Sequence, residues 1–470
     1  MKKINFESIL KEHENPSLKI TLMAVLTIAL PAIIEQIMIT AVQYIDTAMV
    51  GSLGQNATAA VGLTSSTTWL FNGLLSGAAI GFSVQVAQHI GAGRIEKARS
   101  VIRQSLTFVL IFGISLATIG FSISFFLPTW LGADVAIISD AGMYFRILSM
   151  TIPFNFCVLM LSGIIRCAGD SKTPMLLNLC INILNVCFNF LFINATKTYI
   201  LFGKEITVWG AGLGVAGAAL GSGLALFIIS MIYLYVIFHK YKSLRIHFKE
   251  SFKIQKDCFK TMLNLGIPVA LERTLMCVAQ IVITVLITSM GTVAVAANYL
   301  AVTAEAISYL PAYGVAAAGT TLVGQAMGAG RKDIALKCGR IVNCFGVAIM
   351  VVTGFALFMF AEPLIKIFSS DLEVIALGSE VLKIVAFAEP LFGLAIVITG
   401  VLRGAGDTKA PFIICLITMW GVRITLAFLL APTFGLSAVW IAMSAELVVR
   451  GLLFLFRFES KKWMKIKLFD

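Results

Sequence analysis

The chain has 470 residues, of which 59% are hydrophobic and only 13% are charged, and its mean hydropathy is +0.94. About a quarter of the residues of a typical soluble domain are charged, so this composition excludes that class. The formal net charge of +12 would suggest a nucleic-acid partner only if Lys and Arg gathered on one polar domain, which they do not.

Apolar segments long enough to cross a bilayer recur along the whole chain. A transmembrane helix needs about 20 mostly apolar residues, and the alternating pattern of a membrane barrel is absent from the sequence. Twelve segments meet the length requirement: 20–51, 57–89, 103–127, 140–165, 174–194, 211–238, 259–289, 293–327, 341–361, 379–402, 410–431 and 436–457. The sequence therefore predicts an all-α membrane protein with twelve transmembrane helices.

Lys and Arg are distributed unequally between the two sides of the predicted bundle. Most lie in the two tails and in the joints after the even-numbered spans, whereas only Lys197, Lys204 and Lys366 lie in the opposite joints. The positive-inside rule places the basic side in the cytoplasm. We expect a multi-pass plasma (inner) membrane protein with both termini cytoplasmic, whose basic residues face anionic lipid headgroups rather than nucleic acid.

The second half of the chain repeats the first at an offset of 237 residues. Matched positions include Pro31 with Pro268, Glu35 with Glu272, Gln43 with Gln280, Gln88 with Gln325, and Gly91–Arg94 with Gly328–Arg331. Each half holds six spans, so both enter the membrane in the same direction, as in one known plan of secondary transporters. We expect an N-terminal six-helix bundle (1–238), a cytoplasmic linker (239–258) and a C-terminal six-helix bundle (259–470).

Several motifs together resemble one transporter family. They are Pro31 with Asp46-Thr47 and Gly51, the run Gly91–Arg94, Gly324-Gln325 before Gly328, and the Arg-x-Ala-Gly-Asp-x-Lys joints at 166–172 and 403–409. The set resembles multidrug and toxic compound extrusion (MATE) transporters, of the multidrug/oligosaccharidyl-lipid/polysaccharide exporter superfamily, over essentially the whole chain. The resemblance implies two bundles forming a V, alternating access, and export of organic cations against inward Na+ or H+.

The first predicted helix carries the strongest candidate for a coupling site. An ionisable residue inside a span costs about 2.5 to 3.5 kcal/mol on insertion scales, so Asp46 is a functional candidate. A carboxylate in a low-dielectric bundle is costly to keep charged, so it takes up a proton unless a cation neutralises it. Four polar positions on three helices become apolar in the second half: Asp46 maps to Ile283, Asn185 to Val422, Asn189 to Leu426 and Ser222 to Ala445.

We therefore predict one coupling-ion site, formed by Asp46, Asn185, Asn189 and Ser222, in the first half only. The resemblance implies the same positions, although some family members have a second carboxylate where this chain has Asn189. One carboxylate with neutral oxygens suits Na+, at Asp46, Asn185 and Asn189, and equally suits a single proton. The alternative role of the Asn and Ser side chains is ordinary hydrogen bonding between helices.

Further polar residues inside the spans are candidates for holding a cationic or amphipathic small-molecule substrate, or for a second carboxylate. They are Glu35, Glu272, Glu305, Glu389, Gln43, Gln280 and Tyr44. The glutamates of the second half have an alternative role as partners of Arg273, Arg423 or Arg450, most directly Glu446 with Arg450 four residues later. For the joints at 166–172 and 403–409 we expect tight turns with helix caps from Asp170 and Asp407.

Two other classes of function fit the sequence less well. A flippase for a lipid-linked saccharide, from the same superfamily, needs a strongly basic cavity, whereas the charges within these spans are mainly acidic. A membrane enzyme needs a catalytic constellation, and no His lies where it could serve one. We expect a monomeric antiporter that is not an enzyme and uses no cofactor besides its coupling ion.

Overall fold

The computed structural model describes residues 6, 10, 16–201, 204–241, 244–246, 250 and 252–469. The first half contains α2 (Leu18–Gly51), α3 (Gln55–Gly91), α4 (Ile95–Ile123), α5 (Leu127–Trp130), α6 (Val135–Cys167), α7 (Lys172–Ile193) and α8 (Gly214–His239). The second contains α9 (Lys256–Thr288), α10 (Thr292–Gly328), α11 (Lys332–Met359), α12 (Ala361–Lys366), α13 (Leu372–Ala386), α14 (Glu389–Ala405), α15 (Lys409–Leu416), the π-helix η1 (Ile417–Ile424), α16 (Thr425–Glu459) and the 3₁₀-helix η2 (Lys462–Lys465).

The described helices account for the twelve predicted spans. Ten are long and apolar enough to cross a membrane as they stand, and α13 with α14 forms an eleventh that bends by 58°. The tenth helix, Lys409–Glu459, has 51 residues, more than twice the length that a bilayer needs. It breaks at Gly435, whose φ of 58° and ψ of −137° are not helical, so it contains the last two spans.

One joint of the first half contains strands, which the sequence analysis did not predict. Strands β1 (Ala195–Leu201) and β2 (Lys204–Ala211) pair antiparallel between α7 and α8. The segment is rich in Thr, Ile, Val, Tyr and Trp, residue types that favour strands. The hairpin lies wholly between two spans, so the all-α prediction holds for the membrane-spanning part.

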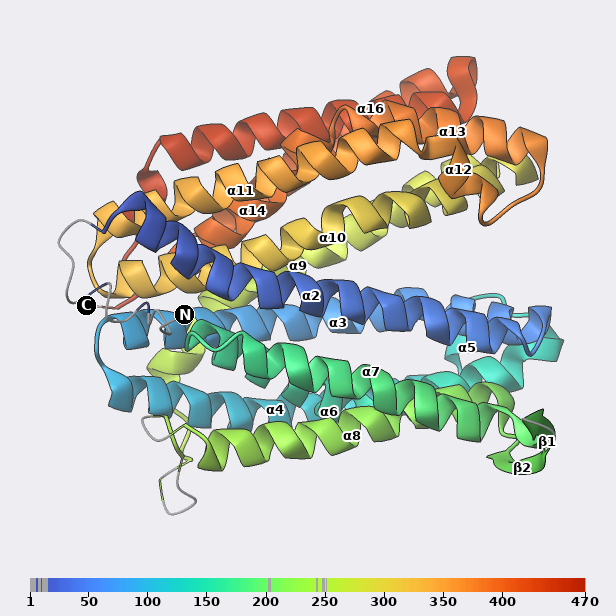
Figure 1. The fold of residues 1–470 in the computed structure, drawn as a ribbon, viewed down its shortest axis with the longest axis horizontal. Coiled ribbons are helices and arrows are strands. Elements are labelled where there is room, and N and C mark those ends of the chain that lie inside the picture. The colour runs from blue at the N-terminus through green and yellow to red at the C-terminus, as the bar shows by residue number, and fades with distance from the viewer. Residues whose placement is uncertain are drawn as a thin grey trace.

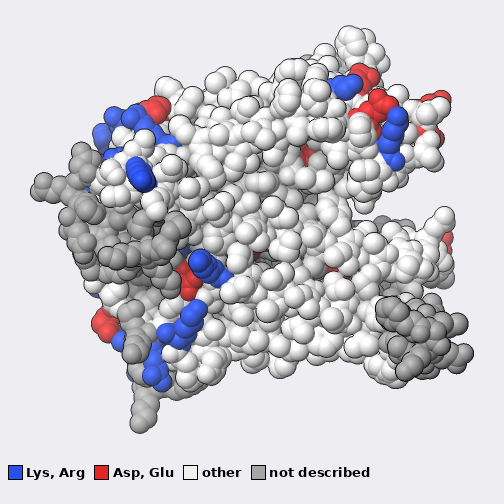
Figure 2. Space-filling model, in the orientation of Figure 1, with Lys and Arg blue, Asp and Glu red and all other residues white. Residues whose placement is uncertain are grey.

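The two halves form two bundles that meet along four helices (Figure 1). Helices α2 and α3 of the first bundle pack against α9 and α10 of the second. Both chain ends lie at one end of the molecule, called here the terminal end, and the β1–β2 hairpin lies at the opposite, hairpin end. Figure 2 shows that Lys and Arg gather mainly at the terminal end and that the surface is hollowed between the bundles at the hairpin end.

Each bundle has a large apolar core cluster, and each cluster also includes residues of one helix from the other half: residues between Ala24 and Ala29 of α2 in the second bundle, and Cys258 and Met262 of α9 in the first. Phe82, Phe156 and Tyr233 belong to the core of the first bundle, and Phe454 and Phe458 to a core of the second. In a membrane, lipid already solvates apolar side chains, so contact between the bundles depends on close packing of small residues.

Candidate functional site

The structure brings the four predicted ion-site residues together near the hairpin end of the first bundle. Asn189 Nδ2 donates to Asp46 Oδ1 at 2.7 Å, and Asn185 Nδ2 lies 3.4 Å from Asp46 Oδ2. The same Asn185 amide donates to Ser222 Oγ at 2.8 Å. Helices α2, α7 and α8 therefore contribute one connected group of polar side chains, whose only charged member is Asp46.

The environment of Asn189 provides an unused oxygen beside this carboxylate. Asn189 is fully buried, and its Oδ1 atom has no hydrogen-bond partner among the described residues. A side chain at Gly221 would overlap that atom, so glycine allows α8 to lie against the amide. Carboxylate, amide and hydroxyl oxygens are ligands of the kind that a hard cation such as Na+ binds. The donor set therefore fits Na+, and Asp46 alone also fits a proton.

The contacts of α7 extend beyond the residues that the sequence analysis selected. Asn178 Nδ2 donates to Glu35 Oε1 at 2.7 Å, and Asn182 Nδ2 donates to the backbone oxygen of Met38 at 2.9 Å. Together with Asn185 and Asn189 they form one face of α7 that contacts α2 along its length. We call these four residues the asparagine face. Their spacing of four, three and four was visible in the sequence and would have revealed Asn178 and Asn182.

A tyrosine that the sequence analysis missed also lies beside this site. Tyr144 of α6 interacts electrostatically with Asp46 and packs on the apolar cluster that contains Val50 and Ile193. No motif or repeat match pointed to this residue. Tertiary structure alone brings it to the carboxylate.

Glu35, a candidate substrate residue, is ion-paired inside its own bundle. One amino group of Arg166 lies 2.6 Å and 2.8 Å from the two carboxylate oxygens, and Ser162 and Asn178 donate to Oε1. Glu35 is only 2% exposed. In this conformation it offers no free carboxylate to a substrate.

Glu272 repeats this arrangement in the second bundle. Arg403 NH2 lies 2.9 Å and 2.8 Å from its two carboxylate oxygens. The sequence alternative that paired Glu272 with a nearby arginine such as Arg273 is therefore wrong, because its partner is Arg403. The joint at 403–409 is therefore not only a turn, because the guanidinium group of Arg403 binds Glu272 inside the bundle. Both pairs join residues 131 positions apart, a separation at which sequence spacing gives no information about contact.

The remaining acidic candidates lie deeper in the second bundle. Glu305 and Glu389 are both buried and interact electrostatically with each other, and Ser308 Oγ donates to Glu389 at 2.9 Å. Neither forms an ion pair within the described part of the chain. Glu446 does pair with Arg450, at 2.6 Å, as the sequence alternative proposed.

The polar side chains of α2 and α9 that were proposed as substrate contacts differ in their exposure and in their partners. Gln43 is exposed, whereas Gln280 is partly buried. Tyr44 is 40% exposed, and its hydroxyl donates across the two bundles to the backbone oxygen of Thr303 at 3.1 Å. The structure therefore does not gather the seven substrate candidates at one place.

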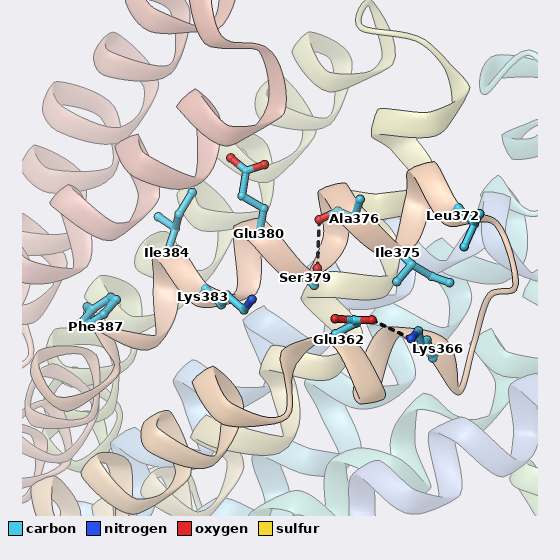
Figure 3. Close-up of a pocket in the computed structure, with 10 residues that line it drawn as sticks. All are labelled: Glu362, Lys366, Leu372, Ile375, Ala376, Ser379, Glu380, Lys383, Ile384 and Phe387. Carbon is cyan, nitrogen blue, oxygen red and sulfur yellow. Dashed lines mark hydrogen bonds and ion pairs between the residues drawn. The ribbon is translucent and has the colours of Figure 1, made fainter.

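A separate surface pocket lies on α12 and α13 (Figure 3). It has a volume of about 770 Å³ and contains the ion pair of Glu362 and Lys366, at 2.6 Å. Lys383 and the exposed Phe387 also line it. None of the predicted site residues lines this pocket, so it is not the candidate ion site.

A comparison with known families supports the resemblance that the motifs suggested. The family model described as MatE matches residues 31–191 and 268–429, which together make up more than half of the chain. The chain belongs to this family. The two matches coincide with the two halves of the repeat, and the predicted MATE fold is confirmed. The family match also confirms the predicted class of protein, a multi-pass membrane transporter and not an enzyme.

Curated relatives of this MATE chain are similar over nearly its full length. The probable multidrug resistance protein NorM of Thermotoga maritima is 30% identical, covering 98% of this chain and 96% of that protein. The multidrug resistance protein MdtK of Edwardsiella ictaluri is 24% identical, covering 94% and 97%. A solved MATE transporter in an outward-facing conformation has a TM-score of 0.87 at 22% identity, covering 98% and 99%, a likeness that concerns the fold.

Proposed function

We propose that this MATE transporter is a secondary active antiporter that exports organic cations or drugs in exchange for inward Na+ or H+. The observation that supports this proposal best is the contrast between Asp46 and the carboxylates that pair with arginine. Glu35, Glu272 and Glu446 are neutralised by arginine, whereas the hydrogen-bond donors to Asp46 are neutral amides. A carboxylate in the bilayer without a fixed cationic partner needs a mobile one, which is what ion coupling requires.

The direction of exchange follows from the placement of Asp46. The terminal end carries most Lys and Arg, so the positive-inside rule puts it in the cytoplasm, with both termini. Asp46 lies near the opposite end of α2, and the molecule is hollowed between its bundles on that side. We infer that ions reach Asp46 from outside the plasma membrane, and that export proceeds by alternating access between the two bundles.

The substrate class is proposed from charge and from the relatives. Glu305 and Glu389 supply buried carboxyl groups that form no arginine ion pair among the described residues, a setting that would favour a cationic or amphipathic small molecule. The relatives named as multidrug resistance proteins favour such substrates over a lipid-linked saccharide. The protein would act as a monomer in contact with membrane lipid.

The proposal is tested by efflux of a fluorescent cation from proteoliposomes, first under an imposed Na+ gradient and then under an imposed pH gradient. We expect one gradient to drive efflux by the native chain, and Asp46→Asn to abolish that stimulation. Asp140→Asn, which neutralises an exposed carboxylate on α6, serves as the control and keeps full activity. Full ion-driven efflux by Asp46→Asn would overturn the assignment.

A further inference from the structure

Two buried glutamines cross between the bundles at the terminal end. Gln88 Nε2, on α3, donates to the backbone oxygen of Gly404 in the second bundle at 3.1 Å. Gln325 Nε2, on α10, donates to the backbone oxygen of Cys167 in the first bundle at 2.7 Å. The donors are related by the 237-residue repeat, and so are the acceptors. The two hydrogen bonds are therefore copies of one contact.

The backbones beside these glutamines touch directly. A side chain at Gly91 would overlap the backbone oxygen of Gln325, and one at Gly328 would overlap that of Gln88. Both glutamines are more than nine-tenths buried. Gly91 lies three residues after Gln88, and Gly328 lies three residues after Gln325. The backbones at the ends of α3 and α10 are therefore in contact, with no room for a side chain between them.

The accepting carbonyls are held in place by the buried ion pairs. Cys167 directly follows Arg166, which binds Glu35 of α2. Gly404 directly follows Arg403, which binds Glu272 of α9. In each half, the arginine therefore fixes the end of the fourth span against the first span of its own bundle. The backbone oxygen of the next residue accepts the hydrogen bond from the glutamine of the other bundle.

We propose that Gln88 and Gln325, with the carbonyls of Gly404 and Cys167, form a two-part latch that holds the terminal end closed. The latch holds the two bundles together in one state of the transport cycle. This inference rests on the proposed alternating access. Opening the terminal end breaks both hydrogen bonds and separates the glycine contacts. The Arg166–Glu35 and Arg403–Glu272 pairs stay intact within their bundles, so that each carbonyl is ready to accept its glutamine when the end closes again.

The two parts of the latch differ in their connection to the candidate ion site. Asn178 joins Glu35 to the asparagine face, which ends at Asp46. The equivalent residue in the second half is Cys415, whose thiol lies 3.8 Å from Glu272, and no asparagine follows it at the equivalent positions. The part formed by Gln325 and Cys167 is therefore the one that a cation or proton at Asp46 can influence through α7, whose asparagines bind both Asp46 and Glu35.

A native thiol reports the state of this latch. Cys167 is 4% exposed, and its sulfur lies 3.8 Å from Thr321 Oγ1 of the other bundle. We expect separation of the bundles to expose this thiol, whereas Cys338, on α11 of the second bundle and 0% exposed, should stay protected. Alkylation by N-ethylmaleimide can be quantified at each cysteine by mass spectrometry, on the full chain in lipid.

The test compares Gln88→Met and Gln325→Met with the native chain, because methionine keeps the length of the side chain and removes the amide. Each substitution should raise the alkylation rate of Cys167 about tenfold, as expected for one lost hydrogen bond, with Cys338 unchanged. Gln104→Met, which removes a buried amide that binds Lys253 and Gln255 of the linker, should leave Cys167 protected.

An unchanged rate at Cys167 in both variants would overturn the latch, and so would an equal rise at Cys338, which would show general loosening of the fold. The assay requires neither an ion gradient nor Asp46. Failure of the latch therefore leaves the antiport proposal standing, and full ion-driven efflux by Asp46→Asn leaves the latch standing.

Discussion

The charge of its neighbours distinguishes Asp46 from the buried glutamates that pair with arginine, which are Glu35, Glu272 and Glu446. A buried ion pair such as Glu35 with Arg166 keeps both groups charged, and removing one partner leaves the other uncompensated. Asp46 instead accepts hydrogen bonds from amides, which lower the cost of its charge without cancelling it. Its net charge can therefore change during a cycle, whereas that of Glu35 is fixed while the pair persists.

The Oδ1 atom of Asn189, unpaired within the described part of the chain, lies beside the Asp46 carboxylate, so replacing this side chain removes a candidate Na+ ligand and should weaken Na+ binding. Asn189→Leu installs the residue that the second half has at the equivalent position, Leu426. An interaction between a neutral polar atom and a charged group contributes about 1.5 to 3 kcal/mol, which corresponds to about 10-fold to 150-fold in affinity. We expect the Na+ concentration for half-maximal efflux to rise by that factor.

The control for this substitution is Asn343→Leu, at a buried asparagine of α11 in the other bundle. It changes the same chemical group away from Asp46 and should leave the Na+ dependence of efflux unchanged. An unaltered half-maximal concentration in Asn189→Leu would exclude a contribution of this residue to Na+ binding.

At the scale of elements, α7 connects the two ends of the first bundle. Its asparagine face contacts Glu35 near the terminal end and Asp46 near the hairpin end. Three of its four equivalents in the second half are apolar, and the fourth is Cys415. Helix pairs joined by side-chain hydrogen bonds keep their register more strictly than pairs joined by apolar contacts alone. We infer that α2 and α7 move together.

Asn178 and Cys415 allow this difference between halves to be measured directly. Asn178→Leu removes a hydrogen bond to a charged carboxylate and should destabilise the protein by about 1.5 to 3 kcal/mol. Cys415→Leu removes only a weak thiol contact with Glu272 and should have a smaller effect. Thermal unfolding of both variants in the same detergent provides the comparison. Equal losses of stability would contradict a special role for the asparagine face.

The start of α7 supplies a prediction about pH. Burial raises the pKa of Asp170, but hydrogen bonds from Thr173 and Tyr241 and the charge of Lys240 outweigh it and hold the pKa below its usual value. Burial raises the pKa of Tyr241, which keeps its hydroxyl protonated as a donor. A carboxylate with a lowered pKa stabilises the folded state above its unfolded pKa, near 3.9, and this contribution is lost as the pH falls through the folded value.

Asp170→Asn keeps an acceptor for the helix cap but removes the charge, so it should destabilise the protein at pH 7 by about 1 kcal/mol, the difference between a hydrogen bond to a charged group and one to a neutral group. The difference from the native chain should shrink as the pH falls below about 4, where the native carboxylate also loses its charge. Melting temperatures measured from pH 7 to pH 3 test both statements, with the exposed Asp140→Asn as the control. A difference that stays constant over this range would rule out the charge of Asp170 as its cause.

At the scale of the whole molecule, hydropathy and the repeat were sufficient to predict twelve spans and two bundles. The loss of polarity at Ile283, Val422 and Leu426 also selected the residues that the structure groups around Asp46. The partners of Glu35 and Glu272 were not predictable, because each ion pair spans 131 residues and depends on how the first and fourth spans pack. The hairpin was missed because hydropathy distinguishes spans from joints, not strands from loops.

The closed terminal end provides the last prediction, because symmetry requires its two glycine contacts to behave alike. A methyl group at Gly91 or Gly328 would overlap the opposite backbone, and backbone, unlike the end of a flexible side chain, cannot move aside locally. Gly91→Ala and Gly328→Ala should therefore each disfavour closure. We expect faster alkylation of Cys167 and slower ion-driven efflux in both variants, to similar extents.

Gly62→Ala is the matched control, since nothing lies within 4 Å of a side chain at that helical position of α3. It should leave alkylation and efflux at native values. If Gly91→Ala opened the terminal end and Gly328→Ala did not, the two contacts could not be equivalent parts of one closure, because the repeat places the same atoms on both sides. Equal effects would instead show that both bundles contribute the same contact to closure, while only the first carries the asparagine face that reaches Asp46.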